Sequence, residues 1–239
     1  GGAVIVLESE AHARARGGGD RAGHGGPVLS RRHGGRRAWP ASSTFGVRRV
    51  KGMGRVQRME GELVLSPTDL AKHLACPHIT TLDLASLDGR GGPAAGGATS
   101  PDDALNLVFS KGMDHERAYL RRLREAGHVV TEIRTRHDAA GRIEAERETV
   151  AAMRSGVGVI YQATFYDGRW GGQADFLLRT DRPSDLGDWS YDIADTQLDR
   201  RLKVPALLQM AAYAERLAEL HGVHPTVLTV LSGNGVARP

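Results

Sequence analysis

The sequence predicts an α/β protein in which a mixed central β-sheet is flanked by helices. After residue 60 the hydrophobic pattern runs in the order helix, strand, helix, three strands, helix and strand, an order typical of a mixed sheet with helices packed against it. The chain has 239 residues, of which 40% are hydrophobic, so it is long enough to bury one core. No internal repeat is visible.

The predicted helices are bounded by recognisable start and stop residues. Ser66, Pro67 and Asp69 form an N-cap, a first helical residue and an acidic first turn, and Pro77 ends that helix. The longest helix is expected over residues 102–126, with Gly127 as its C-cap. Further helices are predicted over residues 143–155 and 205–220.

The predicted strands are short apolar segments between these helices. They are expected over residues 129–134, 157–165, 170–179, 191–196 and 226–231. The turn Tyr166-Asp-Gly-Arg joins the second of them to the third, which favours an antiparallel hairpin at that point.

The positive charge of the chain is confined to its first 58 residues. These hold 11 Arg and one Lys against three acidic residues, a net charge of +9, and the total of +4 therefore leaves −5 for residues 59–239. Residues 1–58 also hold 13 of the 31 glycines, and so glycine-rich a segment buries too little apolar surface to offset its chain entropy. We expect a disordered extension. It is either a phosphate-binding arm or a non-native stretch read through from upstream sequence.

Several protein classes are excluded at this stage. No apolar run approaches the roughly 20 residues of a membrane-spanning helix, which excludes an integral membrane protein. Cys76 is the only cysteine, so an internal disulfide and a four-cysteine metal site within the chain are excluded as well. A reducing, cytoplasmic location follows as the default expectation.

Two acidic residues lie within predicted strands among apolar neighbours. Asp175 is found in Gly172-Gln-Ala-Asp-Phe and Asp195 in Tyr191-Asp-Ile-Ala-Asp-Thr. A carboxylate in such a place is costly to desolvate unless it is paired or binds a cation. Two of them on adjacent strands favour a shared divalent ion, and oxygen ligands suit Mg²⁺ or Mn²⁺.

Four short motifs in order resemble those of the RecB-like nucleases of the PD-(D/E)XK superfamily. They are Gly112-Met-Asp-His-Glu116 on a helix, Gly172-Gln-Ala-Asp175 on a strand, Asp195-Thr-Gln197 on a strand and Gln209-Met-Ala-Ala-Tyr213 on a helix. Leu65-Ser-Pro-Thr-Asp-Leu with Cys76-Pro is similar to a branch found alone or fused to helicase or ribonuclease H-like modules. The resemblance covers residues 60–232 and implies a restriction-endonuclease-like fold.

The resemblance implies a metal-dependent DNA nuclease, hydrolysing phosphodiester bonds, in residues 59–239. By that resemblance His115, Asp175 and Asp195 bind the Mg²⁺ or Mn²⁺ ion, and Gln209 and Tyr213 orient the third motif and contact the DNA backbone. Glu116 is either a partner of these ligands or a surface residue. The resemblance further implies a role in DNA repair and a helicase module in cis or trans as a partner.

One departure from the family pattern affects catalysis directly. Gln197 stands where the family has lysine, so a neutral amide replaces a cation that positions the attacking water. Lys203, in the loop before the next helix, is the alternative source of positive charge. Three readings stay open: an impaired nuclease, an inactive nucleic-acid-binding relative, and an amino-terminal fragment of a larger nuclease–helicase protein. We expect the domain to be truncated after Leu231, where the pattern ends abruptly.

Two further residue types have alternative interpretations. In some RecB-like nucleases a Cys-Pro at the place of Cys76 supplies the first of four iron–sulfur ligands, but no second cysteine exists here. We therefore expect no cluster, and Cys76 to be a small buried residue at a helix end. Trp170 and Trp189 are expected either to pack at strand starts or to stack on a nucleic-acid base.

Overall fold

The computed structural model describes residues 3–6, 56–90, 103–198 and 203–232. Its main sheet has the strand order β1-β8-β7-β6-β5-β4, and a separate hairpin pairs β2 with β3. The strands are β1 (Ala3–Val6), β2 (Gln57–Met59), β3 (Glu62–Val64), β4 (Val130–Glu132), β5 (Val159–Tyr166), β6 (Gly171–Thr180), β7 (Ser190–Gln197) and β8 (Val227–Ser232).

The sheet is mixed, as predicted. β5, β6 and β7 form an antiparallel meander, whereas β4 is parallel to β5 and β8 is parallel to β7. Each parallel pair is joined by a helix, α5 (Ala139–Arg154) between β4 and β5 and α6 (Val204–His221) between β7 and β8. Parallel neighbours require such a crossover, so the five strands β4 to β8 with their helices confirm the mixed α/β architecture.

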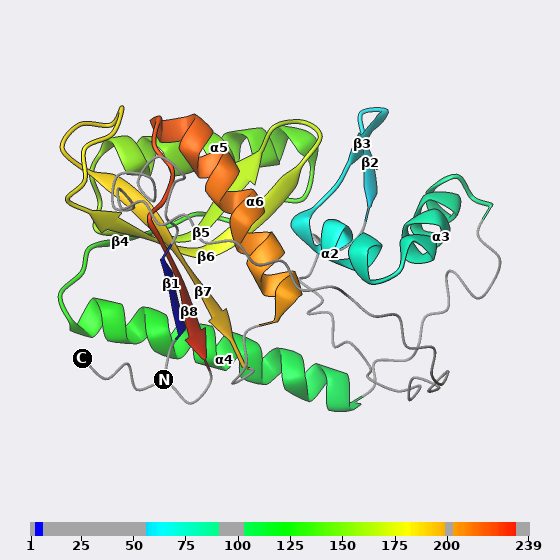
Figure 1. The fold of residues 1–239 in the computed structure, drawn as a ribbon, viewed down its shortest axis with the longest axis horizontal. Coiled ribbons are helices and arrows are strands. Elements are labelled where there is room, and N and C mark those ends of the chain that lie inside the picture. Colours follow the sequence, from blue (N-terminus) through cyan, green and yellow to red (C-terminus); the bar gives the residue numbers. More distant parts are fainter. Residues whose placement is uncertain (1–2, 7–55, 91–102, 199–202, 233–239) are drawn as a thin grey trace, which may run out of the picture. The chain divides into compact units, whose positions relative to one another are not determined.

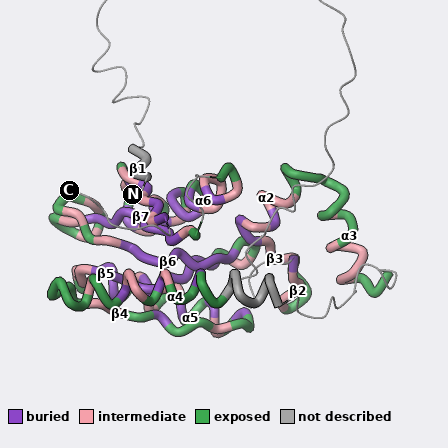
Figure 2. Tube along the Cα trace, turned by 90° about the horizontal axis from the view of Figure 1, so that it is seen from below, coloured by how far each residue is buried: buried purple, intermediate pink, exposed green. Residues whose placement is uncertain are grey.

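Helices cover both faces of this sheet (Figure 1). On one face, side chains of α5 and α6 pack with the strands around the fully buried residues Met153, Leu177 and Met210. On the other face, Leu120 of α4 (Asp103–Glu125) packs with Tyr161 and Phe176. Figure 2 shows the consequence, since β6 lies in the middle of the sheet and is buried along most of its length.

The helix start at Ser66 forms as the sequence predicts. α2 (Pro67–Ala75) begins with a capping box in which the Ser66 side chain accepts from Asp69 N and the Asp69 carboxylate accepts from Ser66 N. Pro77 ends α2, and it is also the first residue of a helix that the pattern did not predict, α3 (Pro77–Leu87). Proline at a first helical position gives up no intrahelical bond, so it begins one helix as readily as it ends another.

The prediction of disorder for the whole of residues 1–58 is wrong at both ends of that segment. Ala3–Val6 forms β1, which pairs antiparallel with β8, and Gln57 and Arg58 belong to β2. An apolar tetrapeptide satisfies its backbone groups by adding to a sheet edge even when its flanks are rich in glycine. Residues 7–55 lie outside the described part of the chain.

Other boundaries shift by a few residues. α5 begins at Ala139 rather than at residue 143, because the Asp138 side chain caps it by accepting from Gly141 N at 2.7 Å. The long helix ends at Glu125, and Gly127 adopts the expected left-handed backbone, with φ 84°. No helix within the described ranges is both long and apolar enough to cross a bilayer.

The capping box gives a first prediction. Ser66→Ala removes the side-chain acceptor for Asp69 N and the hydroxyl that donates to Asp69 Oδ2 at 2.7 Å. We expect the free energy of unfolding to fall by about 1 kcal/mol, measured by urea denaturation. Thr81→Ala, which removes an exposed hydroxyl within α3, is the control and should change it by much less. Equal effects of the two substitutions would contradict the assigned cap.

The last residue of α6 gives a second prediction. His221 is completely buried, and burial lowers the pKa of its imidazole, with a smaller lowering from Arg182. As the pH falls below about 6.5, His221 therefore binds a proton in the unfolded chain but not in the folded chain, and the free energy of unfolding decreases. We expect the unfolding free energy to decrease from about pH 7.5 to 5.5. A His221→Gln variant should show a shallower decrease, and an identical slope would contradict this assignment.

Candidate active site

Two buried carboxylates lie next to each other in the middle of the sheet. Asp175 of β6 directly precedes Phe176, and Asp195 of β7 directly follows Ala194, the antiparallel partner of Phe176. Only 7% of Asp175 and 2% of Asp195 is exposed. The predicted pairing of these residues on adjacent strands is therefore present, at a depth where a bare charge is costly.

Asp175 is bonded to the strand that carries its neighbour. Its Oδ2 accepts from Thr196 N at 2.8 Å and from Thr196 Oγ1 at 2.5 Å. Both donors belong to one buried residue of β7. These two bonds hold the Asp175 carboxylate in one orientation, with Oδ2 facing Thr196 near the end of β7.

Gln197 stands beside Asp195 on the same face of β7. Its Nε2 donates to Asp195 Oδ2 at 2.6 Å, because residues two apart along a strand point in the same direction. The amide satisfies a lone pair of the carboxylate without adding a positive charge. Gln197 therefore hydrogen-bonds the Asp195 carboxylate but does not supply the positive charge that a lysine would bring.

Tyr213 of α6 lies against Gly172 of β6. A methyl group placed on Gly172 would come within 2.4 Å of Tyr213 Cε1 and 2.7 Å of its Oη. The glycine is thus required by the close approach of the ring. Gly172 precedes Asp175 by three residues, so the second and fourth motifs are in direct contact.

The Tyr213 phenol responds to both carboxylates. Burial and then the charges of Asp195 and Asp175 raise the pKa of Tyr213, against hydrogen bonds from Gln173 N–H and the Gln209 side chain that lower it. The hydroxyl is therefore protonated at any physiological pH, and Gln209 is its partner, as the motif spacing of four residues on one helix predicts.

Glu116 reaches the site from the other face of the sheet. It is buried, not a surface residue, and it accepts a short hydrogen bond from Gln162 Nε2. Burial, the charge of Glu116, its hydrogen bond and then the charge of Asp175 raise the pKa of Tyr161. Glu116 and Asp175 thus act on the same tyrosine.

Gln162 has an unusual backbone conformation. Its φ is 58°, in the left-handed region, which costs a residue other than glycine about 1–2 kcal/mol. It lies between the registered pairs Tyr161–Phe176 and Ala163–Ala174, opposite Asp175. The deformation turns the Gln162 side chain toward Glu116 at the level of the carboxylates.

His115 is placed differently from the predicted ligand set. Its Nε2 hydrogen-bonds Leu231 O at 3.0 Å, on β8. Among the described residues no three His, Cys, Asp or Glu side chains lie close enough to hold one ion. The structure therefore brings Asp175 and Asp195 together on adjacent strands, with Gln209 and Tyr213 of α6 close to them, and it holds His115 of α4 against Leu231 of β8.

Two other predicted residues lie at the margins. Lys203 is exposed at the N-cap of α6 and directly follows residues 199–202, which the structure does not describe. Cys76 lies at the end of α2, as predicted, but it is a free thiol that is exposed and not buried.

The residues that sequence reasoning missed are Thr196, Tyr161 and Gln162. The segments Val159-Ile-Tyr-Gln-Ala-Thr-Phe and Asp195-Thr also resemble the family signature, but the resemblance gives none of these three residues a role. No local pattern indicates a left-handed backbone at Gln162. One sequence signal is common to the three residues: each has a polar group within an otherwise apolar strand that carries or adjoins a motif.

Comparison with known proteins assigns no family. No protein-family model matches the chain, and searches of curated proteins and of solved structures found no significant match. Any function proposed for the chain therefore rests on its motifs and on the geometry of the site residues described above.

The contact between Gly172 and Tyr213 gives a third prediction. Gly172→Ala forces the buried ring to move, and overpacking of this kind costs about 1–3 kcal/mol. Thermal unfolding should show a lower Tm than the wild type. Gly158→Ala is the matched control, because its new methyl group would meet nothing closer than 3.6 Å. Similar Tm values for the two variants would contradict the close approach.

Proposed function

We propose that the chain is a divalent-metal-dependent nuclease module that hydrolyses phosphodiester bonds in DNA. The observation that carries the proposal is the pair of buried carboxylates, Asp175 and Asp195, on adjacent strands. Holding two carboxylates at this depth is costly when both carry charge, and a cation between them would lower that cost.

The arrangement of the four motifs supports the same proposal. Gly112 to Glu116 lie on α4, Gly172 to Asp175 on β6, Asp195 to Gln197 on β7, and Gln209 to Tyr213 on α6. Each motif is on the type of element that the RecB-like resemblance requires. The second and fourth motifs also meet, where the Tyr213 ring lies against Gly172, and Gln197 hydrogen-bonds Asp195 within the third motif.

The donor set fits a hard cation. Mg²⁺ is commonly bound by one or two carboxylates together with waters and substrate phosphates, so Asp175 and Asp195 suffice as protein ligands. His115 Nε2 is engaged by Leu231 O, so His115 could join them through Nδ1 or after that bond is broken. A bound Mg²⁺ or Mn²⁺ would supply charge neutralisation at the scissile phosphate and a water of lowered pKa.

The surrounding residues orient the carboxylates. Thr196 fixes Asp175, and Gln197 fixes Asp195, through the bonds described above. Tyr213 remains a neutral phenol and is suited to donate a hydrogen bond to a phosphate oxygen. Gln197 can orient a water but cannot offset negative charge, so turnover is expected to be slow.

A catalytically inactive nucleic-acid-binding relative is the second candidate. The bond from Gln197 Nε2 to Asp195 Oδ2 favours it, since a lysine at that position would bring a cation to the same oxygen. Under this alternative the ion is retained for binding, and hydrolysis is lost with the lysine.

A cleavage assay on single- and double-stranded DNA tests the proposal. With Mg²⁺ or Mn²⁺ present, we expect slow cleavage by the wild type and a rate at least about 100-fold lower for Asp175→Asn, because a metal ligand worth several kcal/mol of barrier is lost. Asparagine keeps a carbonyl oxygen that accepts from Thr196, so the fold should be retained. Gln197→Lys should raise the rate about tenfold or more.

The controls separate the two candidates. Asp181→Asn changes an exposed carboxylate just beyond the end of β6 and should leave the rate unchanged. A silent wild type that gains activity on Gln197→Lys supports the inactive relative. If neither the wild type nor Gln197→Lys cleaves DNA, although thermal unfolding shows that both are folded, the nuclease proposal is contradicted.

A further inference from the structure

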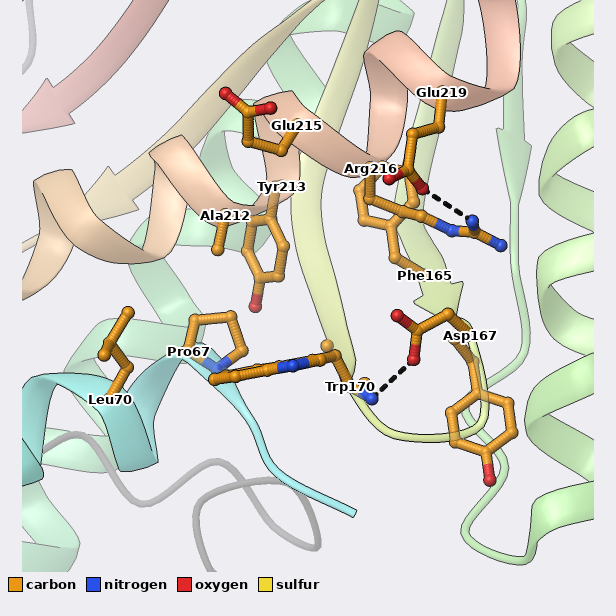
Figure 3. Close-up of a pocket in the computed structure, with 13 residues that line it drawn as sticks. Pro67, Leu70, Phe165, Asp167, Trp170, Ala212, Tyr213, Glu215, Arg216 and Glu219 are labelled. Carbon is orange, nitrogen blue, oxygen red and sulfur yellow. Dashed lines mark hydrogen bonds and ion pairs between the residues drawn. The ribbon is translucent and has the colours of Figure 1, made fainter.

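A pocket opens on the α6 side of the sheet, next to the carboxylate pair. Its volume is about 240 Å³, and its lining includes the apolar or aromatic side chains of Pro67, Leu70, Phe165, Trp170 and Tyr213. Figure 3 shows the Trp170 indole edge-on along one side, with Tyr213 and Phe165 across the space from it. The pocket therefore presents flat aromatic surface to a ligand.

The walls of the pocket are fixed by backbone hydrogen bonds. Leu65 N donates to Arg169 O at 2.8 Å, and Gly171 N donates to Leu65 O at 2.9 Å, on either side of Trp170. Trp170 N in turn donates to Asp167 Oδ1 at 2.6 Å. The start of α2 and the tight turn before β6 are thereby held together, so the site is preformed and little ordering is needed on binding.

The cation in the lining is already neutralised. The Arg216 guanidinium donates to both carboxylate oxygens of Glu146 at 2.9 Å and to Glu219 Oε2 at 2.8 Å. Asp167, Glu215 and Glu219 add carboxylates to the rim. A phosphate beside Arg216 and these carboxylates is therefore disfavoured, whereas an uncharged ring with amino donors matches both the aromatic walls and the acidic rim.

The pocket and the carboxylates share two residues. Tyr213 and Gly172 line the pocket. Tyr213 is close enough to the carboxylates for the charges of Asp195 and Asp175, after burial, to raise its pKa. Gly172 lies three residues before Asp175 on β6, roughly 10 Å along the strand. One short oligonucleotide can reach both places.

We infer that this pocket binds one unstacked nucleobase of single-stranded DNA, with Trp170 as its stacking platform. The inference rests on the proposed function and gives it a substrate class, single-stranded over double-stranded DNA, because a paired base cannot enter without being extruded. Trp170 is suited to this role since 39% of it is exposed, whereas a tryptophan that serves only packing is more completely covered.

Binding by the full-length chain in EDTA tests the inference without cleavage. A fluorescein-labelled deoxycytidine oligonucleotide of roughly 12 nucleotides, whose bases carry the amino donor that the acidic rim favours, is titrated by anisotropy beside an abasic oligonucleotide of equal length. We expect Trp170→Ala to weaken binding of the intact strand about 5- to 150-fold, the effect of one lost stacking contact. Binding of the abasic strand should be unchanged. Trp170→Phe should restore most of the affinity, and Val129→Ala, an exposed site outside the pocket, should have no effect.

The outcomes distinguish this inference from the nuclease proposal. Trp170-dependent binding without cleavage by any variant supports the pocket and contradicts the nuclease. Cleavage by the wild type with equal affinities of Trp170→Ala and wild type contradicts the pocket alone. Equal weakening on intact and abasic strands, or no binding of either strand by a folded wild type, also overturns the inference.

Discussion

The burial of two negative charges side by side is the constraint on which this molecule depends. Asp175 and Asp195 are almost fully enclosed on neighbouring strands, and removing such groups from water costs several kcal/mol each. The surroundings are arranged to reduce that cost. Thr196 gives two donors to one carboxylate and Gln197 gives one to the other, so the β6–β7 ladder holds both charges in a fixed orientation.

The same charges act on both faces of the sheet. On one face they add to the effect of burial, which raises the pKa of Tyr213 and keeps it protonated, and the Tyr213 ring is accommodated because Gly172 has no side chain. On the other face Glu116 adds a third buried carboxylate, and it accepts a hydrogen bond from Gln162, whose backbone is left-handed opposite Asp175. The site is thus a continuous polar path across the sheet, and its acidity accounts for the clustering of amide and hydroxyl donors around it.

Local signals predicted most of the framework. The cap at Ser66, the turn before Trp170 and the apolar runs of β5 to β8 depend on neighbouring residues, so they are readable from a short window. α3 and β1 were missed for the opposite reason. Pro77 both ends and begins a helix, and Ala3–Val6 is a strand only because β8 offers it an edge. The contribution of an edge partner cannot be read from four residues.

The sequence by itself determined the mixed sheet, the crossover helices and the presence of Asp175 and Asp195 on two adjacent strands, since hydrophobic periodicity and turn residues encode these locally. Only the tertiary structure decided which side chains meet. Tyr213 lies on Gly172 from 41 residues further along the chain, His115 bonds the Leu231 carbonyl rather than a carboxylate, and Glu116 turns inward to Gln162. Such contacts follow from how α4 and α6 pack against the sheet, and packing is a property of surfaces that come together only when the chain has folded.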